Sequence, residues 1–218
     1  GKSTLMRLIK RELTPAGRRT GEIRLDGVSL GDVPPETSAF SVGYVMQRPD
    51  EQIVTDKVWH ELSFGMESLG YGSDHIRRRV AEMASFFGIE HWFEKSVEEL
   101  SGGQKQLLNL AAVMVLQPKV LVLDEPTSQL DPIAAAEFFS VLGRIHRELG
   151  TTVIVTEQRL EELLPIADRV AVMEGGRIVA HGDCDTVGRQ LKACDHRMFR
   201  AMPSAMRLWG AVESDAPC

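Results

Sequence analysis

The chain contains two apolar runs of strand length, and a helix pattern separates them. KVLVLDEP occupies residues 119–126 and TTVIVTE residues 151–157, and neither run alternates with polar residues. Continuous apolar runs of this length are typical of strands buried on both faces of a parallel sheet. The intervening segment, PIAAAEFFSVLGRIHREL, has helical periodicity. Strands that alternate with helices predict an α/β fold with a parallel sheet.

The remaining periodic segments add further elements. Helices are expected over residues 2–13 and 159–167 and within about 50–99. Strands are expected over 18–30 and 41–47, and a hairpin over 169–183 around EGG. Within the helical stretch, one apolar face is followed by a glycine that predicts a C-terminal stop. The face and its stop comprise Ile76, Val80, Met83, Ala84, Phe87 and Gly88.

Composition excludes several classes of protein. The 218 residues are enough for one domain with a sizeable core, and the net charge of −6 argues against nucleic-acid binding. No run approaches the roughly 18 apolar residues of a membrane span. The six histidines lack ligand spacing, and the cysteines are interpreted as reduced thiols in a cytosolic protein. These cysteines are Cys184, Cys194 and Cys218.

The first four residues, GKST, match the second half of the phosphate-binding pattern G-x-x-x-x-G-K-[ST], and Thr4 completes the match. Gly1 would let the backbone approach phosphate oxygens, Lys2 would reach the β- and γ-phosphates, and the Ser3 hydroxyl would ligate Mg²⁺. The helix that begins here points its positive dipole end at the anion. A four-residue match also occurs by chance, so its interpretation depends on a second motif.

That second motif is LVLDEP, where an apolar strand ends in two acidic residues, Asp124 and Glu125. The carboxyl edge of a parallel sheet is where such folds bind ligands. Asp124 suits the coordination shell of Mg²⁺, directly or through water. Glu125 has the chemistry to accept a proton from an attacking water or to orient it. The alternative is a solvated acidic pair that follows a core strand.

A third motif, LSGGQ, places two glycines at the start of an apolar helix pattern. Ser101 and Gln104 have the spacing of a capping box, which predicts that the helix starts at Ser101. Gly102 and Gly103 then lie in the first turn, whose backbone amides have no partners within the helix. Without side chains there, an anion can approach those amides closely. The alternative is a flexible loop.

The order of the motifs along the chain resembles that of the ATP-binding cassette (ABC) ATPase family. The motifs are GKST, MQ at the end of a strand, LSGGQ, LVLDEP and SQLD. The resemblance extends from residue 1 to about 185. It implies an α/β P-loop NTPase fold with a RecA-like parallel sheet core, and a helical subdomain inserted at about 50–118. It also implies ATP and Mg²⁺ as cofactors. Residues 186–218 are then interpreted as a linker toward a second cassette.

The resemblance also implies roles for individual residues. LSGGQ is the family signature, whose Ser101–Gln104 contact the γ-phosphate of ATP held by a second cassette, fused or separate. Gln47 matches the Q-loop glutamine, which senses Mg²⁺ and attacking water and links the core to the helical subdomain. Residues 128–131, SQLD, match the D-loop, which ends at Asp131 and crosses the interface between cassettes.

Two departures from the family pattern stand out. Gln158 occupies the position of the switch histidine, and glutamine has no ionisable imidazole. We therefore expect slow or absent hydrolysis at the site that carries Gln158, although glutamine as a tolerated substitute is the alternative. The front half of the phosphate-binding loop does not precede Gly1, so the chain is interpreted as a fragment whose site assignments describe its parent protein.

A subset of the family is indicated by three segments. One segment resembles energy-coupling factor importer ATPases, which take up vitamins or Ni²⁺/Co²⁺: QRPDEQ, followed by a helix and FG. Two further segments resemble the first half of double-cassette members and the linker that follows it: EQRLEELLPIADRV and MFRAMPSAMRLWGAV. Residues 48–62 would then face a transmembrane subunit, with the protein held peripherally at the cytoplasmic face of the membrane. Trp59 and Phe64 either line that surface or pack within the insertion. The rival interpretations are a non-transport ABC ATPase and a degenerate cassette with little hydrolysis.

Overall fold

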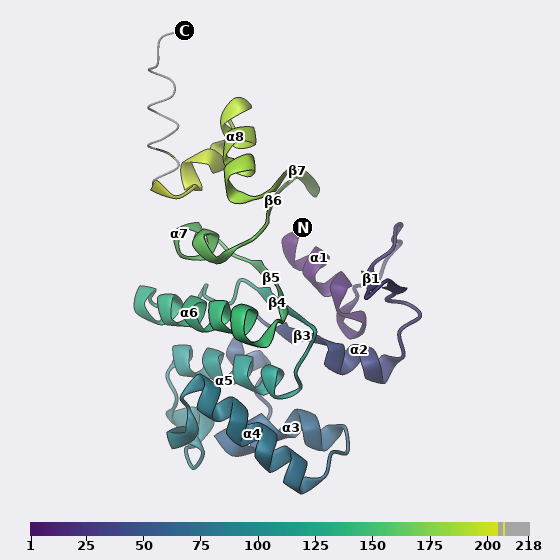
Figure 1. Ribbon diagram of the computed structural model, residues 1–218, viewed down its shortest axis with the longest axis vertical. Helices are drawn as coiled ribbons and strands as arrows, with labels where there is room; N and C mark the ends of the chain where they lie inside the picture. Colours follow the sequence, from purple (N-terminus) through teal and green to yellow (C-terminus); the bar gives the residue numbers. More distant parts are fainter. Residues whose placement is uncertain (205–206, 208–218) are drawn as a thin grey trace. The chain divides into compact units, whose positions relative to one another are not determined.

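A computed structural model describes residues 1–204 and residue 207 of the chain (Figure 1). Cys218 and the rest of residues 208–218, at the end of the expected linker, lie outside the described residues. The chain forms two compact units: residues 3–156 make the larger one, and residues 1–2 with the chain from Glu157 onward make the smaller one. The domain boundaries expected from the sequence, at about 50, 118 and 185, stay a prediction.

The larger unit is built on a three-stranded parallel sheet with the order β3-β4-β5. The strands are β3 (Val42–Val45), β4 (Val120–Asp124) and β5 (Thr152–Thr156). Val45 pairs with Leu123, and Asp124 pairs with Thr156. The central apolar residues of β4 are completely buried, as a continuous apolar run predicts. The expected parallel α/β sheet is confirmed.

Three helices pack around this sheet or lead into it: α1 (Lys2–Ile9), α2 (Pro35–Ser41) and α6 (Pro132–Leu149). Met6 of α1 is buried against Val42, Tyr44 and Val122. Helix α6 has the bounds predicted from its periodicity, and it ends at Gly150, whose φ of 66° is the left-handed conformation that glycine adopts without strain.

The insertion is a group of three packed helices, α3 (Val58–Ser68), α4 (Ser73–Phe87) and α5 (Gly102–Val115), which Figure 1 shows together in blue and teal. The expected apolar face of α4 is confirmed, since its five residues are all buried. Helix α4 ends at Gly88, with a φ of 70°, as its C-terminal signal predicts.

The strand expected over 18–30 is replaced by a short antiparallel pair, β1 (Arg24–Leu25) and β2 (Val28–Ser29). Asp26 and Gly27 connect them with φ values of 50° and 82°. Two consecutive residues with positive φ make the tight turn that an Asp-Gly pair favours, and this turn divides the segment. The sequence prediction of a single strand was therefore wrong.

The smaller unit contains α7 (Leu160–Leu163), β6 (Val170–Glu174), β7 (Arg177–Gly182) and α8 (Cys184–Ala193). The predicted hairpin is confirmed: β6 and β7 pair antiparallel around Gly175–Gly176. Helix α8 was missed in the sequence, although Asp183 caps it by accepting a hydrogen bond from the Thr186 amide at 2.7 Å. The unit has its own apolar core of Leu164, Val172, Ala180, Val187, Leu191 and Met202.

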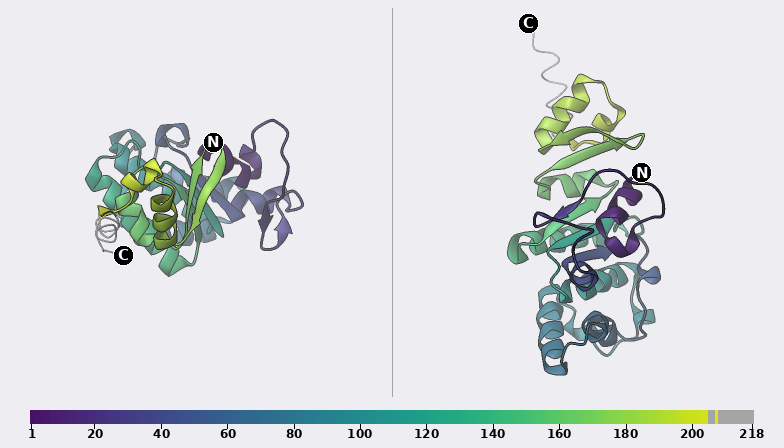
Figure 2. Two further views of the ribbon diagram at one scale, coloured as in Figure 1. Left: turned by 90° about the horizontal axis from the view of Figure 1, so that it is seen from above. Right: turned by 90° about the vertical axis from the view of Figure 1, so that its right-hand side faces the viewer.

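Short 3₁₀ helices complete the described chain. They cover Arg11–Leu13, Pro49–Glu51, Glu90–Trp92, Val97–Glu99, Leu164–Ile166 and Arg197–Ala201. Figure 2 gives two further views of the elements within each unit. Among the described residues, none of the helices combines the length and the apolar character needed to cross a bilayer.

Candidate functional site

The carboxyl edge of the sheet brings Asp124, Glu125 and Thr156 together. The Thr156 hydroxyl donates to Oδ1 of Asp124 at 2.8 Å and accepts from the Glu125 amide at 3.1 Å. The Glu125 amide also donates to the Thr156 carbonyl at 2.9 Å. Because Asp124 and Thr156 are both buried, this hydroxyl holds the aspartate carboxylate in one orientation.

Thr156 was not singled out in the sequence. Its signal was its position as the last residue of the strand beside LVLDEP, since the ends of neighbouring parallel strands meet at one edge of a sheet. The parallel register pairs it with Asp124 across the two strands. Thr156 is therefore a residue of the candidate site in its own right.

Glu125 has an unusual backbone conformation. Its φ is 48°, a left-handed value that costs a residue with a side chain free energy. The two hydrogen bonds from its amide to Thr156 hold the chain in this conformation. Backbone strain of this kind clusters at functional sites, and here it falls on the carboxylate that the sequence assigns to catalysis.

Asp124 also interacts with a tyrosine on the neighbouring strand. Burial raises the pKa of Tyr44, and the negative charge of Asp124 raises this pKa further, while Arg7 of α1 opposes both effects. The Thr156 hydroxyl is thus a hydrogen-bond donor to this buried carboxylate, and the charge of Asp124 is felt by Tyr44 on the neighbouring strand.

The GKST motif begins α1, as expected. Ser3 and Thr4 are exposed in the first turn of that helix, and Lys2 is its first residue. Gly1 and Lys2 belong to the smaller unit, whereas Ser3 and Thr4 belong to the larger one. The larger unit also contains Gln47, Asp124, Glu125, the signature residues 101–104 and Asp131.

Gln47 is exposed, and the backbone beside it is held by two other glutamines. The Gln52 side chain accepts from the Met46 amide at 2.9 Å and donates to the Tyr44 carbonyl at 3.0 Å, as a neighbouring strand would. Gln106 of α5 is buried and donates to the Met46 carbonyl at 3.2 Å. Both the amide and the carbonyl of Met46 are therefore hydrogen-bonded to glutamine side chains, which fixes the backbone immediately before Gln47.

Two more residues of α5 hold the segment after Gln47. The buried amide of Asn109 donates to the Pro49 carbonyl at 3.2 Å. Lys105 pairs with Asp50 at 2.7 Å. Helix α5, which starts with the signature, thus contacts residues 46–50, which we call the Q-loop, through three side chains on one of its faces. Gln52, Gln106 and Asn109 were not identified as site residues from the sequence.

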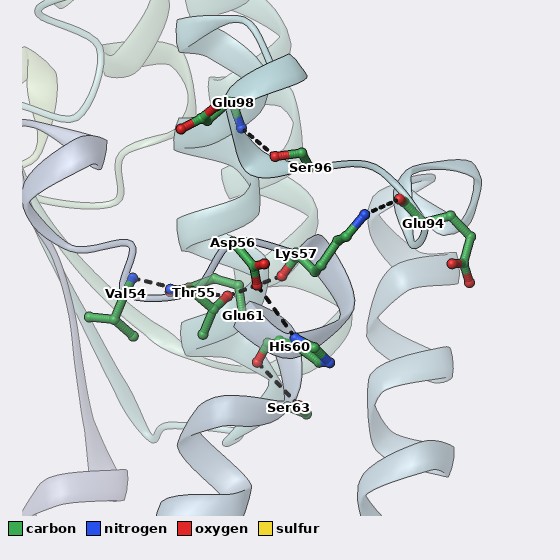
Figure 3. Close-up of polar contacts among 10 residues, drawn as sticks. All are labelled: Val54, Thr55, Asp56, Lys57, His60, Glu61, Ser63, Glu94, Ser96 and Glu98. Carbon is green, nitrogen blue, oxygen red and sulfur yellow. Dashed lines mark hydrogen bonds and ion pairs between the residues drawn. The ribbon is translucent and has the colours of Figure 1, made fainter.

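The loop that follows is held by a buried carboxylate of α3. Oε2 of Glu61 accepts hydrogen bonds from the Val54 amide at 3.1 Å, the Thr55 amide at 2.9 Å and the Thr55 hydroxyl at 3.0 Å. In Figure 3, dashed lines run from the backbone nitrogens of Val54 and Thr55 toward Glu61, with Lys57 beside them. Backbone amides satisfy the carboxylate and order the chain that leads into α3.

The capping box predicted for the signature is confirmed. The Ser101 hydroxyl accepts from the Gln104 amide at 3.3 Å, and Oε1 of Gln104 accepts from the Ser101 amide at 2.9 Å. Ser101 and Gly102 are exposed. The alternative of a flexible loop is wrong, because a reciprocally capped helix begins at these residues.

The D-loop ends in a second capped helix. Oδ1 of Asp131 accepts from the Ile133 amide at 2.9 Å and the Ala134 amide at 3.0 Å, which caps α6. Ser128 and Gln129 are exposed, and Leu130 is buried. Asp131 therefore has a structural role at the start of α6 beside the role that the resemblance implies.

The other residues singled out from the sequence are placed individually. Gln158 is exposed in the smaller unit, and its amide donates to the carboxylate of Glu157 at 2.8 Å. Phe64 is 46% exposed, whereas Trp59 is half-buried and makes an edge contact with Phe93. In the described part of the chain, no three His, Cys, Asp or Glu side chains are grouped so as to hold a metal ion.

Comparison with known proteins decides the family. The family profile described as ABC transporter matches residues 1–128, which is more than half of the chain. The chain belongs to the ABC transporter family. The expected parallel α/β sheet is present, and the expected P-loop NTPase fold is confirmed by the solved structures that the chain resembles.

Individual relatives narrow the assignment. A protein of Bacillus thuringiensis subsp. konkukian, named for the ATP-binding part of an ABC transporter, is 52% identical over 86% of this chain and 34% of its own length. The energy-coupling factor transporter ATP-binding protein EcfA1 of Symbiobacterium thermophilum is 42% identical, over 82% of this chain and 61% of that protein. The chain thus spans about a third of the length of the first of these relatives.

A solved structure gives the same relationship. That of cbiO1 from Clostridium perfringens, described as part of the ABC transporter complex cbiONQ, has 32% sequence identity to this chain. The two structures match over 98% of this chain and 83% of the cbiO1 chain, with a TM-score of 0.76. The cassette is therefore homologous to ATPases of energy-coupling factor transporters and to cbiO1.

Proposed function

We propose that this chain is an ATP-binding and hydrolysing cassette that powers a membrane importer of the energy-coupling factor type. The observation that carries the proposal is the edge of the sheet, where Thr156 orients Asp124 and a strained backbone presents Glu125. The names of the relatives support the transport role, and the QRPDEQ segment supports the energy-coupling factor type. The cargo is then a vitamin or a transition-metal ion, selected by another subunit.

The donor set fits ATP with Mg²⁺. The backbone at Gly1, the amine of Lys2 and the hydroxyls of Ser3 and Thr4 would hold phosphate oxygens at the start of α1. Mg²⁺ prefers hard oxygen ligands, which Ser3, Gln47 and Asp124 supply. When bound, the ion supplies neutralising charge to the phosphate oxygens. Gln47 lies on a loop whose neighbouring peptides are held, so its side chain has a defined starting point.

Glu125 acts in this proposal as the general base or the residue that positions the attacking water. A carboxylate performs this task only when its orientation is reproducible. The two hydrogen bonds that the Glu125 backbone amide donates to Thr156 provide that constraint on the backbone. Gln158 provides an amide for hydrogen bonding where the family has an imidazole, and it does not titrate in the physiological range.

Two partners complete the proposal. Ser101, Gly102, Gly103 and Gln104 would contact ATP bound to a second cassette, with Asp131 and the D-loop at the interface. A transmembrane subunit would hold the protein at the cytoplasmic face of the membrane. Exposed Val54 and Phe64, at 62% and 46%, support a docking surface on the insertion for that subunit.

A direct test uses the full-length protein in its membrane complex. Glu125→Gln should lower ATP turnover on the order of a hundredfold or more, because it removes a proton acceptor and keeps the shape of the side chain. The matched control is Glu137→Gln, an exposed carboxylate on α6. Parental turnover in Glu125→Gln, with ATP still bound, would exclude the assigned role.

A degenerate cassette is the second candidate, and Gln158 is the observation in its favour. If it is correct, Gln158→His raises turnover, while Glu125→Gln has little effect on an already slow site. Equal turnover in the parent and in Gln158→His would exclude this candidate. Co-purification with RNA rather than with a membrane protein would instead favour a non-transport ABC ATPase.

A further inference from the structure

The two signature glycines have different surroundings. A methyl group placed at Gly102 would meet no atom within 4 Å. A methyl group placed at Gly103 would lie 3.0 Å from the Cβ atom of Ala134 and 4.0 Å from a methyl group of Leu130. Carbon atoms pack favourably at about 3.5–4.0 Å, so the first of these distances is too short. Access for phosphate therefore explains Gly102, whereas Gly103 also faces a packing constraint.

The residue that imposes this constraint lies at the start of another helix. Ala134 is in the first turn of α6, and its amide is bound to the cap residue Asp131. Leu130, the D-loop residue just before that cap, is buried. Gly103 likewise lies in the first turn of α5, two residues after its cap residue Ser101. The contact thus joins the capped ends of the signature helix and the D-loop helix.

We propose that Gly103 and Ala134 form a steric contact that positions the signature amides relative to the D-loop. We call this pair the α5–α6 contact. Ala134, which no motif includes, is then a positioning residue for the nucleotide site that the signature completes. The proposal rests on the proposed function, because it assumes that the signature contacts nucleotide held by a second cassette.

The physical argument concerns the separation of two helix ends. Both first turns are held by side-chain caps, so neither can absorb an extra methyl group by local unwinding without losing a cap bond. The added atom therefore moves the first turns apart by a few tenths of an ångström or more. A misplacement of about 1 Å in an active site reduces rates on the order of a hundredfold.

The decisive experiment is a double-mutant cycle in the full-length protein within its membrane complex. Gly103→Ala should lower ATP turnover by about tenfold or more. Ala134→Gly in the same protein removes the opposing methyl group, so Gly103→Ala/Ala134→Gly should regain most of the turnover of the Ala134→Gly protein. If the double variant stays as slow as Gly103→Ala, access for phosphate alone explains the glycine, and the α5–α6 contact is excluded.

A second pair of variants leaves the signature sequence unchanged. Ala134→Val enlarges the contact from the side of α6 and should lower turnover as Gly103→Ala does. Ala136→Val adds the same β-branched side chain on an exposed position of the same helix, so it should retain parental turnover. Equal turnover in Ala134→Val and Ala136→Val would overturn the proposal.

Thermal unfolding separates this proposal from the proposed function. Alanine is favoured over glycine in helices, so Gly102→Ala should raise the unfolding midpoint or leave it unchanged. Gly103→Ala should lower it, and Ala134→Gly in that background should restore part of the loss. These shifts remain measurable if the parent proves to hydrolyse no ATP, an outcome that defeats the proposed function. Restored midpoints without restored turnover would show a contact that stabilises but does not position the signature.

Discussion

Two loops contact helix α5, and they are held on it by opposite means. The Q-loop side is polar: Lys105, Gln106 and Asn109 bind Asp50 and the carbonyls of Met46 and Pro49. The D-loop side is apolar and close: Gly103 faces Ala134 and Leu130. One helix therefore connects the loop that carries Gln47 with the D-loop, which ends at Asp131.

This difference has a practical consequence. Polar contacts are weakened by removing a donor, and most of the loss of stability arises because the acceptor stays buried without a hydrogen bond. A close apolar contact is weakened by adding volume on one side or by leaving a cavity on the other. The two sides of α5 should therefore respond to different kinds of substitution. Three substitutions test this, and a fourth tests the neighbouring carboxylate of α3; they follow in order of expected effect.

The largest effect is expected on the apolar side. Leu130→Ala removes a side chain that is 7% exposed, and the resulting cavity should lower the free energy of unfolding by about 2–5 kcal/mol. Urea unfolding of the purified protein measures this change. Ile133→Ala, three residues later and 75% exposed, is the matched control and should cost far less. Equal losses in the two variants would mean that the D-loop is not packed on α5.

Next in size is the carboxylate that orders the start of α3. Glu61→Leu leaves the amides of Val54 and Thr55 without their acceptor, which should lower the free energy of unfolding by about 3 kcal/mol. Glu61→Gln keeps one oxygen and should lose less. Glu67→Leu, at an exposed position of the same helix, provides the control in the same urea titration. Indistinguishable losses in Glu61→Leu and Glu67→Leu would contradict the network in Figure 3.

A smaller loss of stability is expected where the polar side chains of α5 bind the Q-loop. Gln106→Met keeps the volume of the side chain but leaves the Met46 carbonyl without its donor, which should cost about 1–3 kcal/mol. Because Met46 precedes Gln47, ATP turnover should also fall, by about tenfold. Gln190→Met, on the exposed face of α8, is the control. A stability loss with unchanged turnover would restrict Gln106 to a structural role.

The smallest effect is expected for the ion pair. Asp50 is 72% exposed, so Lys105→Met should cost less than about 1 kcal/mol. The difference between variant and parent should shrink in about 1 M NaCl, because salt weakens the attraction between solvent-exposed charges. Thermal unfolding at low and high salt measures both. A loss as large as that of Gln106→Met would show that charge, rather than buried hydrogen bonds, holds the Q-loop.

Local patterns in the sequence predicted much of the fold. The capping box of Ser101 and Gln104, the bounds of α6 and the β6–β7 hairpin depend on residues a few positions apart, so their signals are contained in short segments. The division of residues 18–30 by the Asp26–Gly27 turn was also readable, but it was overlooked. Helix α8 follows a weaker local signal, a single aspartate cap before a polar segment.

The sequence by itself determined the family, the strand and helix alternation, and the identity of the acidic, glycine and serine residues of the candidate site. Only the tertiary structure decided that Thr156 orients Asp124, that Gln106 and Asn109 hold the Q-loop, and that Ala134 lies against Gly103. These partners are separated by about thirty to sixty residues along the chain. Periodicity and spacing describe neighbours within one element, whereas such contacts depend on how separate elements pack, so no local pattern predicts them.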